Sequence, residues 1–134
     1  MSYEGSPQGL VEESQEVVLV VDDNADLRDM IVALLEDYGF QTAAAANGAE
    51  AVVLLSRGLR PALILLDLMM PVMDGWETLK WLKTQRELSA IPVVIVSAGP
   101  DRPASAAYFV QKPFDCDALI EILRSCAAAV VTAG

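Results

Sequence analysis

Four apolar runs in this 134-residue sequence each end in a polar side chain that is able to do chemistry. The run ends are Asp22 and Asp23 after residues 17–21, Asp67 after 63–66, Ser97 after 92–96 and Lys112 after 108–111. Carboxylates close together raise one another's pKa unless a cation lies between them. Ligand sets made only of oxygen suit Mg²⁺. A carboxylate can also act as a nucleophile, so the set is suited to holding Mg²⁺ and handling a phosphoryl group.

The pattern around these runs predicts the elements that must position them. Continuous apolarity favours strands that are buried on both faces of a sheet. Helical patterns lie between them, and one of these carries Trp76, Leu79 and Leu82 on the same face. We expect strands over 17–21, 40–45, 63–66, 92–96 and 108–111, and helices over 24–38, 49–56, 76–85 and 115–130. This alternation predicts an α/β fold with a parallel sheet, whose strands end at one edge, where ligands bind.

Four motifs in this order resemble those of the receiver domains of two-component response regulators, in particular the single-domain, chemotaxis type. They are VVDDN at 20–24, LLDLMMPVMDG at 65–75, VVIVSA at 93–98 and FVQKPF at 109–114. The resemblance covers nearly all of the chain from 17 to about 126. It implies a doubly wound, flavodoxin-like sheet of five parallel strands in the order 2-1-3-4-5.

The resemblance implies a role for each acidic residue at the predicted sheet edge. Asp67 would accept a phosphoryl group from a histidine kinase or a phosphotransfer protein. Asp22 and Asp23 would hold Mg²⁺ together with Asp67 and the backbone carbonyl of Met69. On this reading the protein is not an enzyme in the ordinary sense, since it assists only its own phosphorylation and dephosphorylation.

Three further positions match residues that respond to the phosphoryl group in the family. Lys112 would pair first with Asp67 and then with the phosphate, and Ser97 would donate a hydrogen bond to a phosphoryl oxygen. Phe109 matches the aromatic position that reorients as Ser97 moves inward. The resemblance also implies a cis peptide bond between Lys112 and Pro113.

The connection over residues 98–107 departs from the family pattern. It has ten residues and contains Pro100 and Pro103, which disfavour a helix across the segment. Ten extended residues can return along a strand, whereas ten helical residues advance only about 15 Å. We therefore expect the family's fourth helix to be lost or reduced to one turn after Pro103, and no family-type dimer through that helix. This departure keeps an alternative open, namely a pseudo-receiver that binds partners without being phosphorylated.

Composition limits the remaining function classes. The chain has no histidine, 9 basic and 19 acidic residues, and a net charge of −10. Histidine-based triads and histidine metal ligands are therefore excluded. A pI near 4.2 argues against nucleic-acid or anionic-membrane partners. We expect signalling through a downstream protein target.

The ends of the chain and its cysteines complete the expectations. Residues 1–16 contain four glutamates and no basic residue, and they are interpreted as a flexible acidic tail before a receiver domain at 17–130 and a short tail at 131–134. Cys116 and Cys126 lie about 15 Å apart if they share one helix, too far for a disulfide. Reduced cysteines and the lack of a long apolar run suggest a cytoplasmic location.

Overall fold

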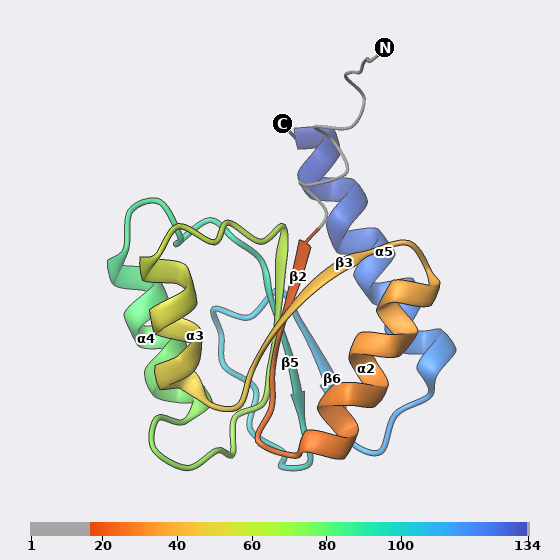
Figure 1. Ribbon diagram of the computed structural model, residues 1–134, viewed down its shortest axis with the longest axis horizontal. Helices are drawn as coiled ribbons and strands as arrows, with labels where there is room; N and C mark the ends of the chain where they lie inside the picture. Colours follow the sequence, from red (N-terminus) through yellow and green to blue (C-terminus); the bar gives the residue numbers. More distant parts are fainter. Residues whose placement is uncertain (1–16, 134) are drawn as a thin grey trace.

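The computed structural model describes residues 17–133, in which five parallel strands form one sheet. The strands are β2 (Val17–Val21), β3 (Gln41–Ala45), β4 (Leu63–Leu66), β5 (Val93–Ser97) and β6 (Tyr108–Gln111). Their order across the sheet is β3-β2-β4-β5-β6. In order of appearance this is 2-1-3-4-5, so the predicted doubly wound fold is confirmed. Figure 1 shows the two helical layers that flank this sheet.

The described residues form four helices; the first three connect strands and begin at side chains that cap them, and the fourth follows the last strand. The helices are α2 (Ala25–Asp37), α3 (Gly48–Ser56), α4 (Gly75–Thr84) and α5 (Cys116–Ala133). Asn24, Asn47 and Asp74 each accept a hydrogen bond from a backbone N–H of the first turn. Helix α5 ends at Ala133, beyond the end near Val130 that the sequence pattern predicts. None of the described helices has the length and apolar character needed to cross a membrane.

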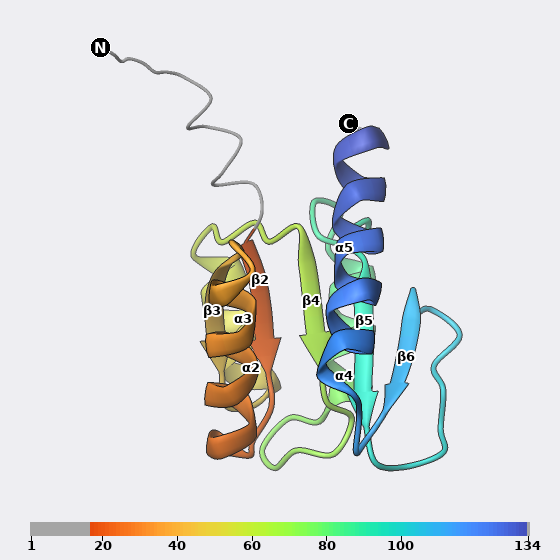
Figure 2. The same ribbon diagram turned by 90° about the vertical axis from the view of Figure 1, so that its right-hand side faces the viewer.

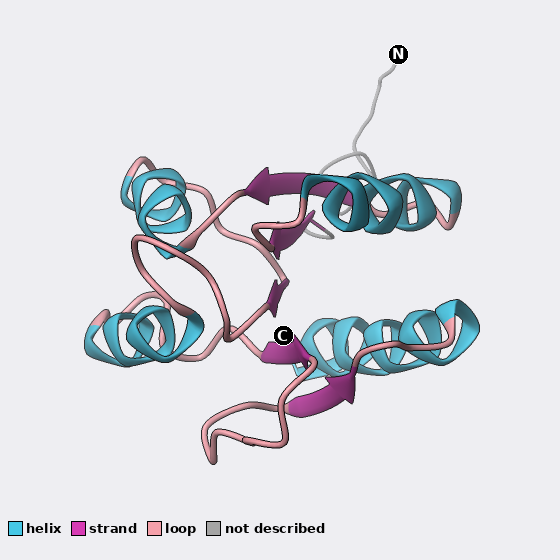
Figure 3. Cartoon of the chain, turned by 90° about the horizontal axis from the view of Figure 1, so that it is seen from below, coloured by secondary structure: helices cyan, strands magenta, loops and turns pink. Residues whose placement is uncertain are grey.

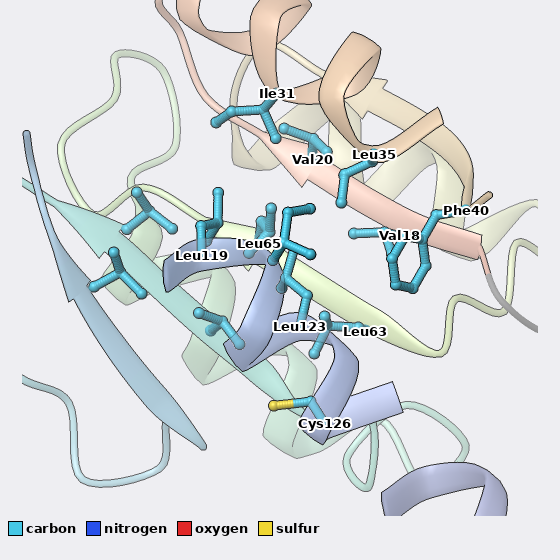
Figure 4. Packing of buried hydrophobic residues seen from close by; sticks show 14 residues of the cluster. Val18, Val20, Ile31, Leu35, Phe40, Leu63, Leu65, Leu119, Leu123 and Cys126 are labelled. Atoms are coloured by element: carbon cyan, nitrogen blue, oxygen red, sulfur yellow. The ribbon is translucent and has the colours of Figure 1, made fainter. Parts of the chain in front are cut away.

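Each face of the sheet has its own hydrophobic core. Helices α2 and α5 pack on one face, where Ile31, Leu35, Leu119 and Leu123 meet strand residues such as Leu65 (Figure 4). Helices α3 and α4 pack on the other face, where their leucines meet the opposite side chains of the same strands. Figure 3 shows the two helix pairs on either side of the sheet. Strands β2, β4 and β5 are buried on both faces, which explains their continuous apolar runs.

The segment over residues 98–107, between β5 and β6, contains no α-helix, which confirms the expected loss of the fourth helix. Its regular feature is a turn in which the Ala106 N–H donates to the Pro103 carbonyl at 3.2 Å. Figure 2 shows the segment as an irregular loop outside β6. Tyr108 on β6 is 47% exposed, so this edge of the sheet is thinly covered.

One residue of the predicted helix face lies differently from the expectation. Leu79 and Leu82 are buried beneath α4, but Trp76 is 44% exposed. Helical spacing alone placed all three on one face. Trp76 is in the first turn of α4, next to the loop over 68–74, and its ring lies beside the groove between α4 and the segment over 98–107.

Candidate functional site

Asp67 lies directly after β4 and is held by the loop that follows it. The residue is only 5% exposed, and its Oδ1 accepts a hydrogen bond from the Met69 N–H at 3.1 Å. Gly75 closes the loop by donating its N–H to the Leu68 carbonyl at 3.0 Å. A Cβ on Gly75 would collide with the Asp67 carbonyl and would lie 2.6 Å from the Leu68 Cα. The backbone under Asp67 therefore requires glycine at position 75.

Asp22 and Asp23 follow the neighbouring strand β2. Asp22 is 3% exposed, and its Oδ1 accepts from the Asn24 N–H at 2.9 Å, whereas Asp23 is exposed. Oxygen atoms of Asp22, Asp23 and Asp67 all lie within 4.8 Å of one another. Strand pairing explains this approach, because β2 and β4 are adjacent and both end at this edge.

Lys112 reaches this carboxylate cluster from β6, at the far side of the edge. Its Nζ donates to Asp22 Oδ2 at 2.9 Å and to Asp67 Oδ2 at 3.2 Å. The peptide bond from Lys112 to Pro113 is cis, as the resemblance implies. The lysine side chain is largely buried, so both ion pairs are poorly screened by water.

The electrostatics of the cluster show that one lysine does not fully compensate the carboxylates. Burial raises the pKa of Asp67 above its ordinary value, although the Met69 N–H and Lys112 act in the opposite direction. Burial would lower the pKa of Lys112, but the hydrogen bond and charge of Asp22, with those of Asp67, outweigh it and the pKa is raised. Lys112 therefore stays charged, whereas ionising the buried Asp67 carboxyl still costs free energy.

The cluster fits a divalent cation. Three carboxylates and one ammonium leave two negative charges, which a doubly charged ion neutralises, and oxygen donors are those that Mg²⁺ prefers. The donors that face one another are Asp22, Asp23 and Asp67, and the main chain of Met69 is adjacent to them. The cluster contains no sulfur or imidazole ligand, so its chemistry is not that of a typical zinc site.

Ser97 and Phe109, the two remaining residues of the predicted site, differ in how they are connected to this cluster. Ser97 ends β5, is 1% exposed, and its carbonyl accepts from the Lys112 N–H at 2.9 Å, which links it to the lysine through the backbone. Its hydroxyl accepts weakly from the Gly99 N–H at 3.4 Å. Phe109 is half-buried against the core beneath α3 and α4, and the Arg102 guanidinium stacks 4.6 Å from its ring centroid.

Two residues that support the cluster were missed by sequence reasoning. Arg28 donates from its Nη1 to the Asp22 carbonyl at 2.7 Å and so fixes the end of β2. Its place one helical turn after the capping Asn24 was a usable signal, because that spacing points a long side chain back toward the strand end. Gly75 gave a weaker signal, since an Asp-Gly pair predicts a turn without showing which backbone it contacts.

The fold and this edge are those of a response regulator receiver domain, and the chain belongs to that family. The family model for the response regulator receiver domain matches residues 18–124. The polar-differentiation response regulator DivK of Brucella anthropi is 36% identical over 115 residues, which cover 81% of this chain and 93% of DivK.

Other relatives and solved structures agree with this assignment. The DNA-binding response regulator MtrA of Mycobacterium tuberculosis is 35% identical over 115 residues, and the match spans 81% of this chain but only 49% of MtrA. The chain thus matches about half the length of such relatives. A CheY-like receiver domain from Methanospirillum hungatei superposes with a TM-score of 0.78 at 30% identity, covering 88% of this chain and 98% of that one.

A further solved structure contains a metal ion. It is the receiver domain of a sensor histidine kinase from Pseudomonas aeruginosa, with a magnesium ion coordinated in its active site cleft. It has a TM-score of 0.77 at 25% identity and covers 84% of this chain and 98% of its own.

Proposed function

We propose that this receiver domain accepts a phosphoryl group on Asp67 from a histidine kinase or a phosphotransfer protein. The observation that carries the proposal is the buried cluster in which Lys112 Nζ contacts both Asp22 and Asp67. Membership of the receiver family supports the same reading. The protein then signals through a change in its surface and acts as a signalling protein, not as an enzyme with an external substrate.

In the transfer step the Asp67 carboxylate attacks phosphorus, and a bond between phosphorus and oxygen forms. The bond from phosphorus to the donor's imidazole nitrogen breaks, and the bonding electrons leave with that nitrogen. Asp22, Asp23, Asp67 and the Met69 carbonyl are the groups that would hold Mg²⁺. When bound, Mg²⁺ neutralises charge on the phosphoryl oxygens.

Lys112 and Ser97 complete the proposed chemistry. The Lys112 ammonium stabilises the negative charge that moves from Asp67 onto the phosphate oxygens. The Ser97 hydroxyl donates to a phosphoryl oxygen once it turns from its weak contact with the Gly99 N–H. Phe109 is the proposed switch aromatic, and its half-buried position under Arg102 is the state that the switch would alter.

Charge and family membership indicate the partners. A net charge of −10 supports a protein target, because nucleic-acid binding requires clustered basic residues. The DNA-binding MtrA is matched over only half its length, in the part that corresponds to this receiver domain. We place the protein in the cytoplasm with its histidine kinase, in keeping with its two free cysteines.

Mass spectrometry after incubation with acetyl phosphate and Mg²⁺ tests the proposal. We expect one added phosphate that hydroxylamine removes, and no addition in the Asp67→Asn variant. Asp101→Asn, on an exposed side chain in the connection between β5 and β6, is the matched control and should be modified like the parent. Equal modification of the Asp67→Asn variant and the parent would show that the acceptor lies elsewhere.

The metal is tested separately by thermal unfolding. Saturating Mg²⁺ should raise the melting temperature, since an ion at 100 times its Kd stabilises the folded state by about 2.7 kcal/mol. Asp23→Ala should remove most of this response because it deletes one of the three facing carboxylates. A melting temperature that does not change when Mg²⁺ is added would contradict the proposed metal site.

The alternative function is a pseudo-receiver, and the helix-free segment between β5 and β6 favours it. Such a module would bind its partner equally well with and without the phosphoryl group. An unmodified protein after the acetyl phosphate incubation, with its fold intact, would decide for this alternative.

A further inference from the structure

A groove lies where α4 faces the helix-free segment between β5 and β6. It has a volume of about 440 Å³, within the range of about 300–1,000 Å³ that is usual for binding pockets. Trp76 and Leu79 line it from α4, and Pro103 and Ala104 line it from the segment over 98–107. None of its described lining residues belongs to the carboxylate cluster. The groove is therefore a second candidate site, separate from the phosphoacceptor edge.

The α4 residues in this groove follow one stripe along the helix. Trp76, Leu79, Lys80 and Lys83 are spaced i, i+3, i+4 and i+7, which places them on the same face. The first half of the stripe is apolar and the second half is basic. A partner that matches this face presents apolar side chains to the first half and acidic side chains, one turn further on, to the second.

The basic half of the stripe has a charge opposite to that of the whole protein. Lys80 and Lys83 are the charged residues among the described lining, in a chain of net charge −10. Both are exposed, and none of the ion pairs among the described residues includes either lysine. Lys83 Nζ donates to the Ser89 carbonyl at 3.1 Å, which leaves further donors available. Charge complementarity therefore favours an acidic partner.

Trp76 provides an apolar anchor at the start of the stripe. It is 44% exposed, and tryptophan is among the residue types that most often carry the binding energy of protein interfaces. We propose that the groove binds an acidic amphipathic helix of another protein. The apolar side chains of that helix contact Trp76 and Leu79, and its carboxylates pair with Lys80 and Lys83. This binding does not require a phosphoryl group on Asp67.

The dimensions of the groove suit a helix of about three turns. Helix α4 has 10 residues and therefore extends about 15 Å, which is the length of the matching contact. Helices that bind in grooves insert apolar anchors at the spacing i, i+3, i+4 and i+7, which is the spacing of the α4 stripe. A helix in this position would also cover the face of the sheet on which Phe109 is only partly buried.

An NMR titration of the unmodified full chain, without Mg²⁺ or a phosphoryl donor, tests the proposal. The probe is a synthetic helical peptide of about 14 residues. It carries leucines and then glutamates on one face, in a background of alanine and glutamine. We expect amide shifts concentrated in residues 76–83 and 103–105. A scrambled peptide of the same composition, and a peptide with lysine in place of glutamate, should not shift these amides.

Charge reversal tests the ion pairs. The Lys80→Glu, Lys83→Glu double variant should bind the acidic peptide about tenfold more weakly, because like charges now face one another. It should instead bind the lysine peptide at the same amides. The matched control is Arg57→Glu with Arg124→Glu, which reverses two exposed charges outside the groove and should bind the acidic peptide like the parent.

A steric block tests the groove without changing charge. Ala104 is exposed, so Ala104→Tyr should fill the groove, keep the circular dichroism spectrum of the parent and prevent binding of the acidic peptide. Equal binding of the acidic and scrambled peptides, or shifts outside the groove, would overturn the proposal. Shifts in 76–83 that grow with protein concentration alone would also overturn it, because they would show a second copy in the groove. None of these results depends on whether Asp67 is phosphorylated.

Discussion

The two connections on either side of β5 differ in how they cover the sheet. The connection before β5 contains α4, which begins at the capping box of Asp74 and Glu77 and buries Leu79 and Leu82. The connection after it, over residues 98–107, contributes a turn and the stack of Arg102 on Phe109. Both nevertheless bring their strands to the same edge, where the Lys112 N–H donates to the Ser97 carbonyl. Strand pairing therefore positions the site, and the connecting helices determine how much of the sheet is shielded from solvent.

The largest expected effect is a loss of core packing beneath α4. Leu82→Ala removes a side chain that is almost fully buried and should lower the free energy of unfolding by about 2–5 kcal/mol. Ser105→Ala, on the exposed side of the other connection, should change it by less than about 0.5 kcal/mol. Urea unfolding measures both. Similar losses at the two positions would contradict the difference between the connections.

A smaller effect is expected when a methyl group is added at Gly75, and almost no effect when one is added at Gly99. Gly75→Ala forces a Cβ against the backbone under Asp67 and should cost about 1–3 kcal/mol, as overpacking does, and slow modification by acetyl phosphate. Gly99→Ala, in the connection after β5, finds open space around the new Cβ. It should leave both stability and the modification rate close to those of the parent. Thermal unfolding and mass spectrometry report the two quantities.

The free energy of unfolding, measured against pH in the presence of EDTA, tests the cost of burying the Asp67 carboxylate. The pKa of Asp67 lies above its ordinary value of 3.8, so the folded chain binds this proton more tightly than the unfolded chain does. Stability therefore falls as pH rises from 3.8 through the raised pKa. Asp67→Asn should be more stable than the parent at neutral pH, and the gap should close below 3.8.

A matched variant controls for the general effect of removing one negative charge. Asp101→Asn changes an exposed carboxyl in the connection after β5 and should show no such gap. Chemical unfolding at a series of pH values measures the difference. An Asp67→Asn variant that is less stable than the parent at neutral pH would contradict the assigned cost of burying this carboxylate.

The smallest effect is expected at Arg102. Removing its guanidinium from the Phe109 ring with Arg102→Ala should cost about 0.5–1 kcal/mol, the usual value for an exposed cation–π contact. Backbone amides over 98–107 should exchange hydrogen faster than those of α2 in the parent and faster still in the variant. Arg86→Ala, on another exposed arginine, should not change exchange in this segment.

Much of the fold could be predicted because local patterns carried it. The buried strands β2, β4 and β5 lie within a residue of their expected places, since continuous apolar runs signal burial on both faces. The missing fourth helix was predictable from chain length and prolines. The exposure of Trp76 could not be predicted, because helical spacing shows which face of the helix a side chain shares but not how much of that face the rest of the chain covers.

The features of the candidate site also fall into two groups, those that the sequence determines and those that only the tertiary structure shows. The residue types at the strand ends, the absence of histidine and the acidic balance belong to the sequence alone. The pairing of Lys112 with Asp67 was expected from the family resemblance. The tertiary structure alone showed that Lys112 also contacts Asp22, that Arg28 holds the Asp22 carbonyl and that Gly75 lies against the Asp67 backbone. Asp22 and Lys112 are ninety residues apart. Their distance depends on how five strands pair and twist, and local sequence patterns do not encode that packing.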